Sequence, residues 1–168
     1  THAANVATFQ SPWWGPLGVV DGDRVIFRRA QLGRQTFLPH SLCKKVDLIK
    51  LVTGSDAAYL DFAVSRGVDG IVVESFGRGN VPPYVIPGIA RALEKGIIVV
   101  NATRTGGRVL DEYGYEGGML QQHKMGVIMA GELSAAKARL KLMLILSQYG
   151  PDGRPDPAEV ARYFEHSM

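Results

Sequence analysis

Residues 67–73 read GVDGIVV, residues 77–80 read GRGN and residues 95–100 read KGIIVV. Two short runs rich in β-branched side chains, separated by a glycine loop and a helix-length segment, indicate a strand, a loop, a helix and a second strand. Open α/β sheets bind their ligands in loops at the carboxyl ends of such parallel strands. Asn80 is the conspicuous polar residue of this loop.

The alternation of strands and helices extends to both sides of this unit. The predicted fold is therefore a three-layer α/β architecture, in which a small parallel sheet of about four strands has helices on both faces. The glycine-rich residues 105–118 are expected to form a loop. Strands are expected at 46–53, 71–73, 97–100 and 126–130, and helices at 56–66, at 85–95, after Ser134 and through Val160, Tyr163 and Phe164.

Capping residues and apolar spacing give further expectations for the helices. Ser55 and Ser134 each precede a helix and are expected to cap its free amides. Gly88 is expected to weaken the helix at 85–95 slightly. In the helix after Ser134, the spacing favours a buried face made of Leu140, Met143, Leu144 and Ser147.

The first 45 residues lack this alternation. Residues 17–20 and 24–27 are short apolar runs around Asp21-Gly22, a pattern typical of a hairpin. The basic segment that follows has no apolar period and is expected to be a surface linker. We therefore divide the chain into residues 1–45, with the hairpin and linker, and a compact domain of residues 46–168.

Composition narrows the classes of function. With 168 residues, of which 46% are hydrophobic, the chain can form one domain with a sizeable core. Its longest apolar runs, such as 97–100 and 142–146, are much shorter than the roughly 18 residues of a membrane span. The formal net charge is only +3 and the signs are interleaved. We therefore expect neither a membrane nor a nucleic-acid partner.

The sequence has few motifs for metal binding, cofactor binding or nucleophilic catalysis. Cys43 is the single cysteine and the four histidines are scattered, so neither a metal nor a cofactor is expected. The loop at 77–79 lacks the third glycine of a dinucleotide fingerprint because Pro82 stands at that position. No serine or cysteine has a local partner that would make it a nucleophile.

Three polar or aromatic features remain as candidates. Asn80 offers a donor and an acceptor at once, which suits a ligand with amine and carbonyl groups; a turn residue or helix cap is the alternative. The carboxylates of Asp111, Glu112 and Glu116 lie in a glycine-rich loop of a length that is often functional, and simple solvation is their alternative. The tryptophan pair at 13–14 is expected to pack over the following Gly-Pro turn rather than to anchor a partner.

Several short motifs follow one another along almost the whole chain. They are VATF at 6–9, GPLG at 15–18, GIV at 70–72, GRGN at 77–80, VV at 99–100, TR at 103–104, GRV at 107–109 and LSAAKARL at 133–140. Each motif is weak by itself. In their order and spacing they resemble the carboxyl-terminal domain of bacterial-type L-asparaginases.

This resemblance implies an amidohydrolase that converts L-asparagine to L-aspartate and ammonia through a threonine nucleophile, without metal or organic cofactor. The family carries that threonine, a second threonine, an aspartate and a lysine in its first domain, which is missing here. Thr105-Gly106-Gly107 is similar to the family's Thr-Gly-Gly-Thr motif, but Arg108 replaces the last threonine and the segment follows a second-domain strand. We therefore expect no catalytic residue in this chain and no activity of the chain alone.

The resemblance also implies a site shared between subunits. In the family, the second domain of one subunit completes the active site of its neighbour in a close dimer, and two dimers commonly form a tetramer. Asn80 matches the family asparagine that reaches the α-amino region of the substrate. A family glutamate comes from the loop after Arg104, where this sequence departs from the pattern, so Glu116 is the first choice for it and Glu112 the second.

The expected partners are thus L-asparagine, the missing first domain and further copies in a homodimer or homotetramer. The chain begins at Thr1 with neither an initiator Met nor a targeting segment, so we expect a processed chain or a fragment. The compartment stays open, with the cytoplasm preferred to the periplasm or secretion.

Two other functions stay open at this point. A non-catalytic, flavodoxin-like module would use the loop after Val73 to bind a small anion or an amino acid. An independent hydrolase is least favoured because the sequence has no recognisable nucleophile constellation. A Thr-Gly-Gly-Thr segment and a Gly-Thr-Asp-like segment upstream of Thr1 would distinguish an asparaginase from both.

Overall fold

The computed structural model describes residues 3–11, 13–30 and 33–165. The chain divides into two compact units, residues 1–36 and residues 37–168, and each is described by itself. The domain boundary expected between residues 45 and 46 stays a prediction.

The first unit contains the predicted hairpin. Its strands β1 (Gly18–Asp21) and β2 (Arg24–Phe27) pair antiparallel with Asp21 opposite Arg24, and Gly22 turns the chain with a φ of +60°. A short 3-10 helix, η1 (Val6–Thr8), precedes it. The two indoles at 13–14 are 64% and 68% exposed, so the expectation that they pack over the next turn is wrong.

The second unit is built on a four-stranded sheet, and all its neighbouring strands are parallel. In spatial order the strands are β3 (Val46–Lys50), β4 (Gly70–Ser75), β5 (Ile98–Thr103) and β6 (Ile128–Met129). The two central strands are almost completely buried, as their runs of Ile and Val require. The predicted fold class is therefore confirmed.

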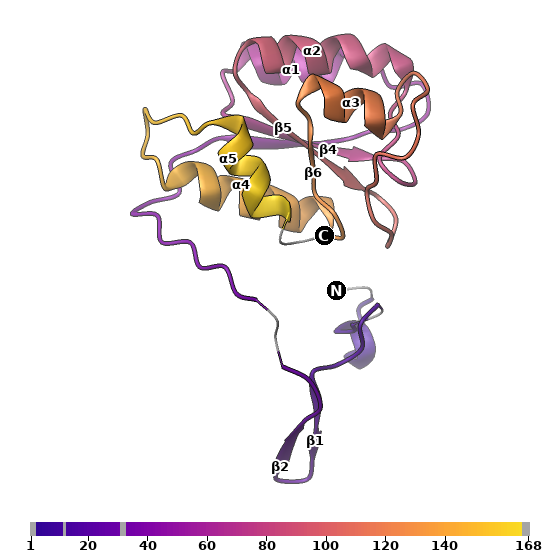
Figure 1. The fold of residues 1–168 in the computed structure, drawn as a ribbon, viewed down its shortest axis with the longest axis vertical. Coiled ribbons are helices and arrows are strands. Elements are labelled where there is room, and N and C mark those ends of the chain that lie inside the picture. The colour runs from indigo at the N-terminus through magenta and orange to yellow at the C-terminus, as the bar shows by residue number, and fades with distance from the viewer. Residues whose placement is uncertain (1–2, 12, 31–32, 166–168) are drawn as a thin grey trace. The chain divides into compact units, whose positions relative to one another are not determined.

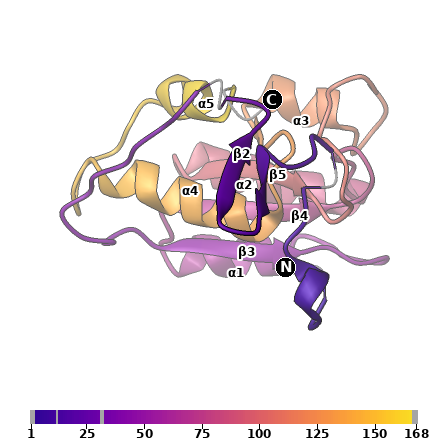
Figure 2. The same ribbon diagram turned by 90° about the horizontal axis from the view of Figure 1, so that it is seen from below.

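Helices cover both faces of this sheet (Figures 1 and 2). One core lies between the sheet and α1 (Ala58–Ser65) and α2 (Ile86–Glu94), with Leu60 and Ile89 at its centre. The opposite core lies under α4 (Ala135–Ser147) and α5 (Pro157–Glu165). A one-turn 3-10 helix, η2 (Pro83–Val85), leads into α2. No helix in the described part of the chain has the length and apolarity needed to cross a membrane.

Two expectations about helices are wrong. The structure has an additional helix, α3 (Met119–Met125), directly after the glycine-rich stretch, where the sequence indicated a loop leading into a strand. In α4 the buried face is not the predicted one, because Leu140 is 54% exposed and Met143 and Leu144 are only half-buried. Apolar residues occupy every position from 142 to 146, so spacing alone cannot select a face. The face against the sheet consists of Ala135, Ala138, Leu142, Ile145, Leu146 and Ser147.

The expected serine caps are also wrong. The Ser55 hydroxyl accepts a hydrogen bond from the Val52 amide at 2.9 Å, upstream of the helix, and the carboxylate of Asp56 accepts one from the Ala58 amide at 3.0 Å. Ser134 stands at the N-cap position of α4 but makes no side-chain capping bond. The Ser55 and Asp56 side chains therefore bond to nearby backbone amides in the turn before the helix.

Helices α1 and α2 are joined by packing and by an ion pair. Nε and a terminal nitrogen of Arg91 donate to the two carboxylate oxygens of Asp61 at 2.7 and 2.8 Å. This hydrogen bonding lowers the pKa of Asp61 from its ordinary value. At Gly88 the helices approach so closely that an added Cβ would lie 2.9 Å from the Ala57 Cβ and 3.0 Å from the Leu60 Cβ.

The Gly88→Ala variant tests this close approach. Helix propensity alone predicts a gain in stability, but overpacking between α1 and α2 should outweigh it and lower the free energy of unfolding by about 1–3 kcal/mol. Urea unfolding followed by circular dichroism measures the change. Glu94→Ala, on the exposed end of the same helix, is the control and should stay within about 0.5 kcal/mol of the unmodified chain. A stabilised Gly88→Ala protein would contradict the packing argument.

Candidate functional site

The loop after β4 is closed by backbone hydrogen bonds of its own. The Phe76 amide donates to the Asn80 carbonyl at 2.9 Å, and the amides of Gly79 and Asn80 both donate to the Phe76 carbonyl at 3.0 Å. The turn requires a φ of +48° at Gly77 and +114° at Gly79, values that glycine adopts without strain. The GRGN sequence is therefore a tight turn that presents Asn80 at the carboxyl end of a central strand.

Gly79 is also required because its surroundings leave no room for a side chain. A Cβ at this position would lie 2.8 Å from Val109 Cγ1 and 3.1 Å from the Met119 sulfur. The turn thus packs directly on the segment after β5 and on the start of α3. Its position depends on these neighbours as well as on its own hydrogen bonds.

A buried polar network holds this turn to the sheet. The Asn101 amide nitrogen, on β5, donates to the Gly79 carbonyl at 2.9 Å and to Gln122 Oε1 at 2.7 Å. The Ser75 hydroxyl, at the end of β4, donates to Asn101 Oδ1 at 2.6 Å. All three side chains are buried, so each hydrogen bond compensates the desolvation of a polar group.

The same network reaches the acidic loop through Gln122. Its Nε2 donates to the Gly79 carbonyl at 2.9 Å and to the Gly117 carbonyl at 3.1 Å. The Val81 amide, next to Asn80, also donates to the Gly117 carbonyl, at 2.9 Å. One glutamine side chain on α3 therefore holds the turn at 76–80 beside the residue that follows Glu116.

The structure brings the predicted site residues to one edge of the sheet. Asn80 is half-buried, and its side-chain amide makes no hydrogen bond within the described ranges 3–11, 13–30 and 33–165. Glu116 is exposed and likewise has no hydrogen bond or ion pair to any residue that the structure describes. Glu112 differs, because its carboxylate lies 3.3 Å from an Arg78 guanidinium nitrogen.

The hydroxyl of Thr105 is a structural group in this loop. It lies 3.0 Å from the Thr103 hydroxyl, 3.4 Å from the Gly77 carbonyl oxygen and accepts a hydrogen bond from the Gly107 amide at 3.2 Å. Neither a hydroxyl nor a backbone carbonyl can take up a proton as a general base. These contacts tie the loops after β4 and β5 together.

The sequence analysis missed Ser75, Asn101 and Gln122. A signal existed for the first two, because a serine and an asparagine interrupt apolar runs at the ends of two central strands. Gln122 lies on the helix that the sequence analysis did not predict, and an isolated glutamine has no distinctive pattern. Among the described residues, no group of three or more His, Cys, Asp and Glu side chains is arranged to hold a metal ion.

The fold and this edge of the sheet define a parallel α/β domain with a loop site at the ends of its central strands. Residues 45–164 match the family model described as the glutaminase/asparaginase C-terminal domain. The chain therefore belongs to this family, which confirms the resemblance found in the sequence.

Curated relatives agree with this assignment. The chain is 35% identical over 149 residues to an L-asparaginase of Bacillus licheniformis, covering 88% of this chain and 46% of that protein. It is 28% identical to L-asparaginase 2 of Escherichia coli, covering 98% of this chain and 46% of that protein. A glutamyl-tRNA(Gln) amidotransferase polypeptide of Pyrococcus furiosus is 34% identical, covering 77% of this chain and 29% of that protein. The chain thus spans less than half the length of these relatives.

Replacing Gln122 by Met tests the buried network. Methionine keeps much of the side-chain volume but removes the Gln122 hydrogen bonds to the Asn101 amide and to the Gly79 and Gly117 carbonyls. The two carbonyls keep their donors on Asn101 and Val81, whereas one N–H of the Asn101 amide loses its acceptor, at a cost of about 1–3 kcal/mol. We expect a lower free energy of unfolding and faster amide exchange at Gly79 and Val81. Gln148→Met is the matched control because Gln148 is exposed. Equal stability of the two variants would show that the network does not hold the loops.

Proposed function

We propose that this chain is the C-terminal domain of an L-asparaginase, which hydrolyses L-asparagine to L-aspartate and ammonia. In this proposal the domain completes the active site of a neighbouring subunit. Family membership and the L-asparaginase relatives support it. The observation that carries it is the free Asn80 amide, held at the end of a central strand beside the loop that carries Glu116.

The chemistry of the two side chains suits the α-amino end of an amino acid. A primary amide can accept from an ammonium group and donate to a carboxylate at the same time. A carboxylate adds a charge-assisted hydrogen bond to the ammonium, which is stronger than a neutral one. Asn80 and Glu116 are therefore proposed as substrate contacts. Glu112 is the weaker candidate because Arg78 already pairs with it.

The proposed division of labour leaves the nucleophile outside this chain. Hydrolysis of an amide by covalent catalysis needs a hydroxyl beside a group that accepts its proton. The Thr105 hydroxyl bonds to a hydroxyl and to backbone groups instead. The half of the relatives that this chain does not match is the natural place for the nucleophile.

Two kinds of relative bear on the choice of activity. L-asparaginases cover more of this chain than the amidotransferase polypeptides do, at 88% for the Bacillus licheniformis protein against 77% for the Pyrococcus furiosus protein. We therefore propose the asparaginase activity. The flavodoxin-like binding module has no comparable support.

The first test removes the Asn80 amide in a full-length protein that carries this domain. Asn80→Ala should lower kcat/KM for L-asparagine by roughly tenfold or more, since losing one hydrogen bond to a charged group costs about 1.5–3 kcal/mol. Glu116→Ala should act similarly, and Glu112→Ala should be milder. Ammonia release is measured, with Gln148→Ala as the amide control. Unchanged kinetic constants in Asn80→Ala would return Asn80 to the role of a turn residue.

A mixing experiment tests the role in the neighbouring subunit. A chain without the nucleophile and an Asn80→Ala chain should each be weakly active, whereas a mixed dimer contains one pocket in which both contributing domains are intact. Random exchange should then restore about a quarter of the full activity. Mass spectrometry confirms that subunits exchange. No recovery in confirmed mixed dimers would contradict completion across subunits.

The purified 168-residue chain should release no ammonia from L-asparagine above the enzyme-free rate. Catalysis needs a nucleophile held beside its activating group, and Thr105 lacks that arrangement. The matched variant is Thr105→Ala. Turnover by the unmodified chain that disappears in Thr105→Ala would overturn both the assignment of Thr105 and the proposed division of labour.

A further inference from the structure

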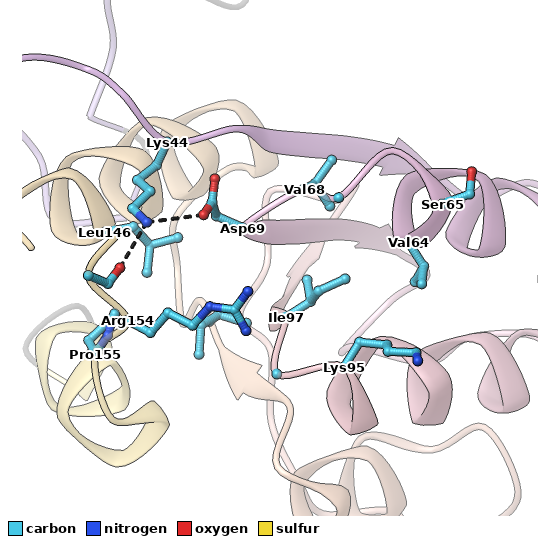
Figure 3. Close-up of a pocket in the computed structure, with 14 residues that line it drawn as sticks. Lys44, Val64, Ser65, Val68, Asp69, Lys95, Ile97, Leu146, Arg154 and Pro155 are labelled. Carbon is cyan, nitrogen blue, oxygen red and sulfur yellow. Dashed lines mark hydrogen bonds and ion pairs between the residues drawn. The ribbon is translucent and has the colours of Figure 1, made fainter. Parts of the chain in front are cut away.

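A cavity of about 420 Å³ opens at the amino ends of β4 and β5, the edge of the sheet opposite to Asn80 (Figure 3). Its walls come from the segments before these two strands, at 67–69 and 95–97, and from residues 153–155 before α5. This volume falls within the range of small-molecule sites in proteins. The asparaginase proposal makes no use of this cavity.

One wall is built on a buried ion pair. Lys44 is 6% exposed, and its Nζ donates to Asp69 Oδ1 at 3.1 Å and to the carbonyls of Pro151 and Gly153 at 2.7 and 2.8 Å. The Lys44 charge is therefore balanced, and its three hydrogen bonds tie the segment at 151–153 to the start of β4. This fixed wall gives the cavity a defined shape without adding net charge to it.

Two further cations line the cavity without an acidic partner. Neither the Lys95 ammonium nor the Arg154 guanidinium makes a hydrogen bond or ion pair within the part of the chain that the structure describes. In Figure 3 the Arg154 guanidinium extends into the cavity, and the Lys95 ammonium lies on the other side of the Ile97 side chain. The apolar Ile97 side chain thus lies between the two charges.

Beside Ser65, Asp69 and the cations, the cavity has apolar side chains in its lining. They are those of Val64, Val68, Ile97, Ile98 and Leu146. An anion with one compact charge, such as phosphate, would leave this surface uncovered and would reach only one of the two cations. A ligand with two negative ends and a short methylene chain matches both the charges and the apolar lining.

We propose that this cavity binds a short aliphatic dicarboxylate. One carboxylate pairs with the planar Arg154 guanidinium, which presents two parallel donors to a carboxylate. The other pairs with the Lys95 ammonium, and the methylene groups cover Ile97. The site is separate from Asn80, so the proposal stands or falls independently of the asparaginase activity.

Succinate is the probe for a titration of the ¹⁵N-labelled 168-residue chain at constant ionic strength. We expect saturable shifts of the amides of Gly67, Gly96, Ile97 and Gly153, which line the cavity. Butyrate has the same chain with one carboxylate and should bind about tenfold more weakly or worse. Phosphate should also bind more weakly than succinate.

Two charge-removing variants complete the test. Arg154→Gln and Lys95→Met should each weaken succinate binding by about tenfold or more, because each loses a charged hydrogen bond. Arg24→Gln and Lys137→Met remove exposed cations elsewhere and should leave the affinity unchanged. The amide spectra of all four variants show whether they keep the fold.

Three outcomes would overturn the proposal. In the first, butyrate or phosphate binds as tightly as succinate, which shows that two separated charges are not recognised. In the second, the shifts scatter over the surface lysines and arginines, which shows nonspecific anion binding. In the third, folded Arg154→Gln and Lys95→Met proteins keep full affinity.

Discussion

The buried side chain of Asn101 connects the parts of this domain on which the candidate site depends. It accepts from Ser75 on β4 and donates to the Gly79 carbonyl in the turn and to Gln122 on α3. A buried amide is costly unless its donors and acceptors are satisfied. The network is therefore stable only when both loops occupy their observed positions. The turn and the acidic loop are held by the sheet, and their backbones do not depend on a bound ligand for support.

At both edges of the sheet, loop carbonyls accept hydrogen bonds from side chains, but the donors differ between the two edges. At the carboxyl ends, neutral amides and hydroxyls satisfy the carbonyls of two glycine loops. At the amino ends, the Lys44 ammonium satisfies two carbonyls of the segment before α5 and pairs with Asp69. Between these edges the two central strands, β4 and β5, are almost completely buried. The candidate site with Asn80 lies at the carboxyl ends, where open α/β sheets bind their ligands.

Membership of the glutaminase/asparaginase C-terminal family gives this arrangement a functional context. In the function proposed above, the domain supplies substrate contacts but no nucleophile, and it thereby controls which substrate is held in a site assembled with another domain. The contribution of such contacts to catalysis depends on preorganisation, because a misplaced donor forms a weaker hydrogen bond with the substrate. The rigid turn and the glutamine bridge between the loops provide that preorganisation for Asn80 and for the loop with Glu116.

The sequence by itself determined the hairpin, the four parallel strands and the glycine turn, because these depend on local apolar runs and on the backbone freedom of glycine. The short helix α3 was not predicted, because its seven residues are too few to show a clear helical spacing of apolar side chains. Tertiary structure alone decided four other features. They are the buried face of α4, the contact at Gly88, the network of Ser75, Asn101 and Gln122, and the separation of Arg154 from Lys95. Each of these features joins residues that lie far apart in the chain, and only the packing of the sheet against its helices brings them together.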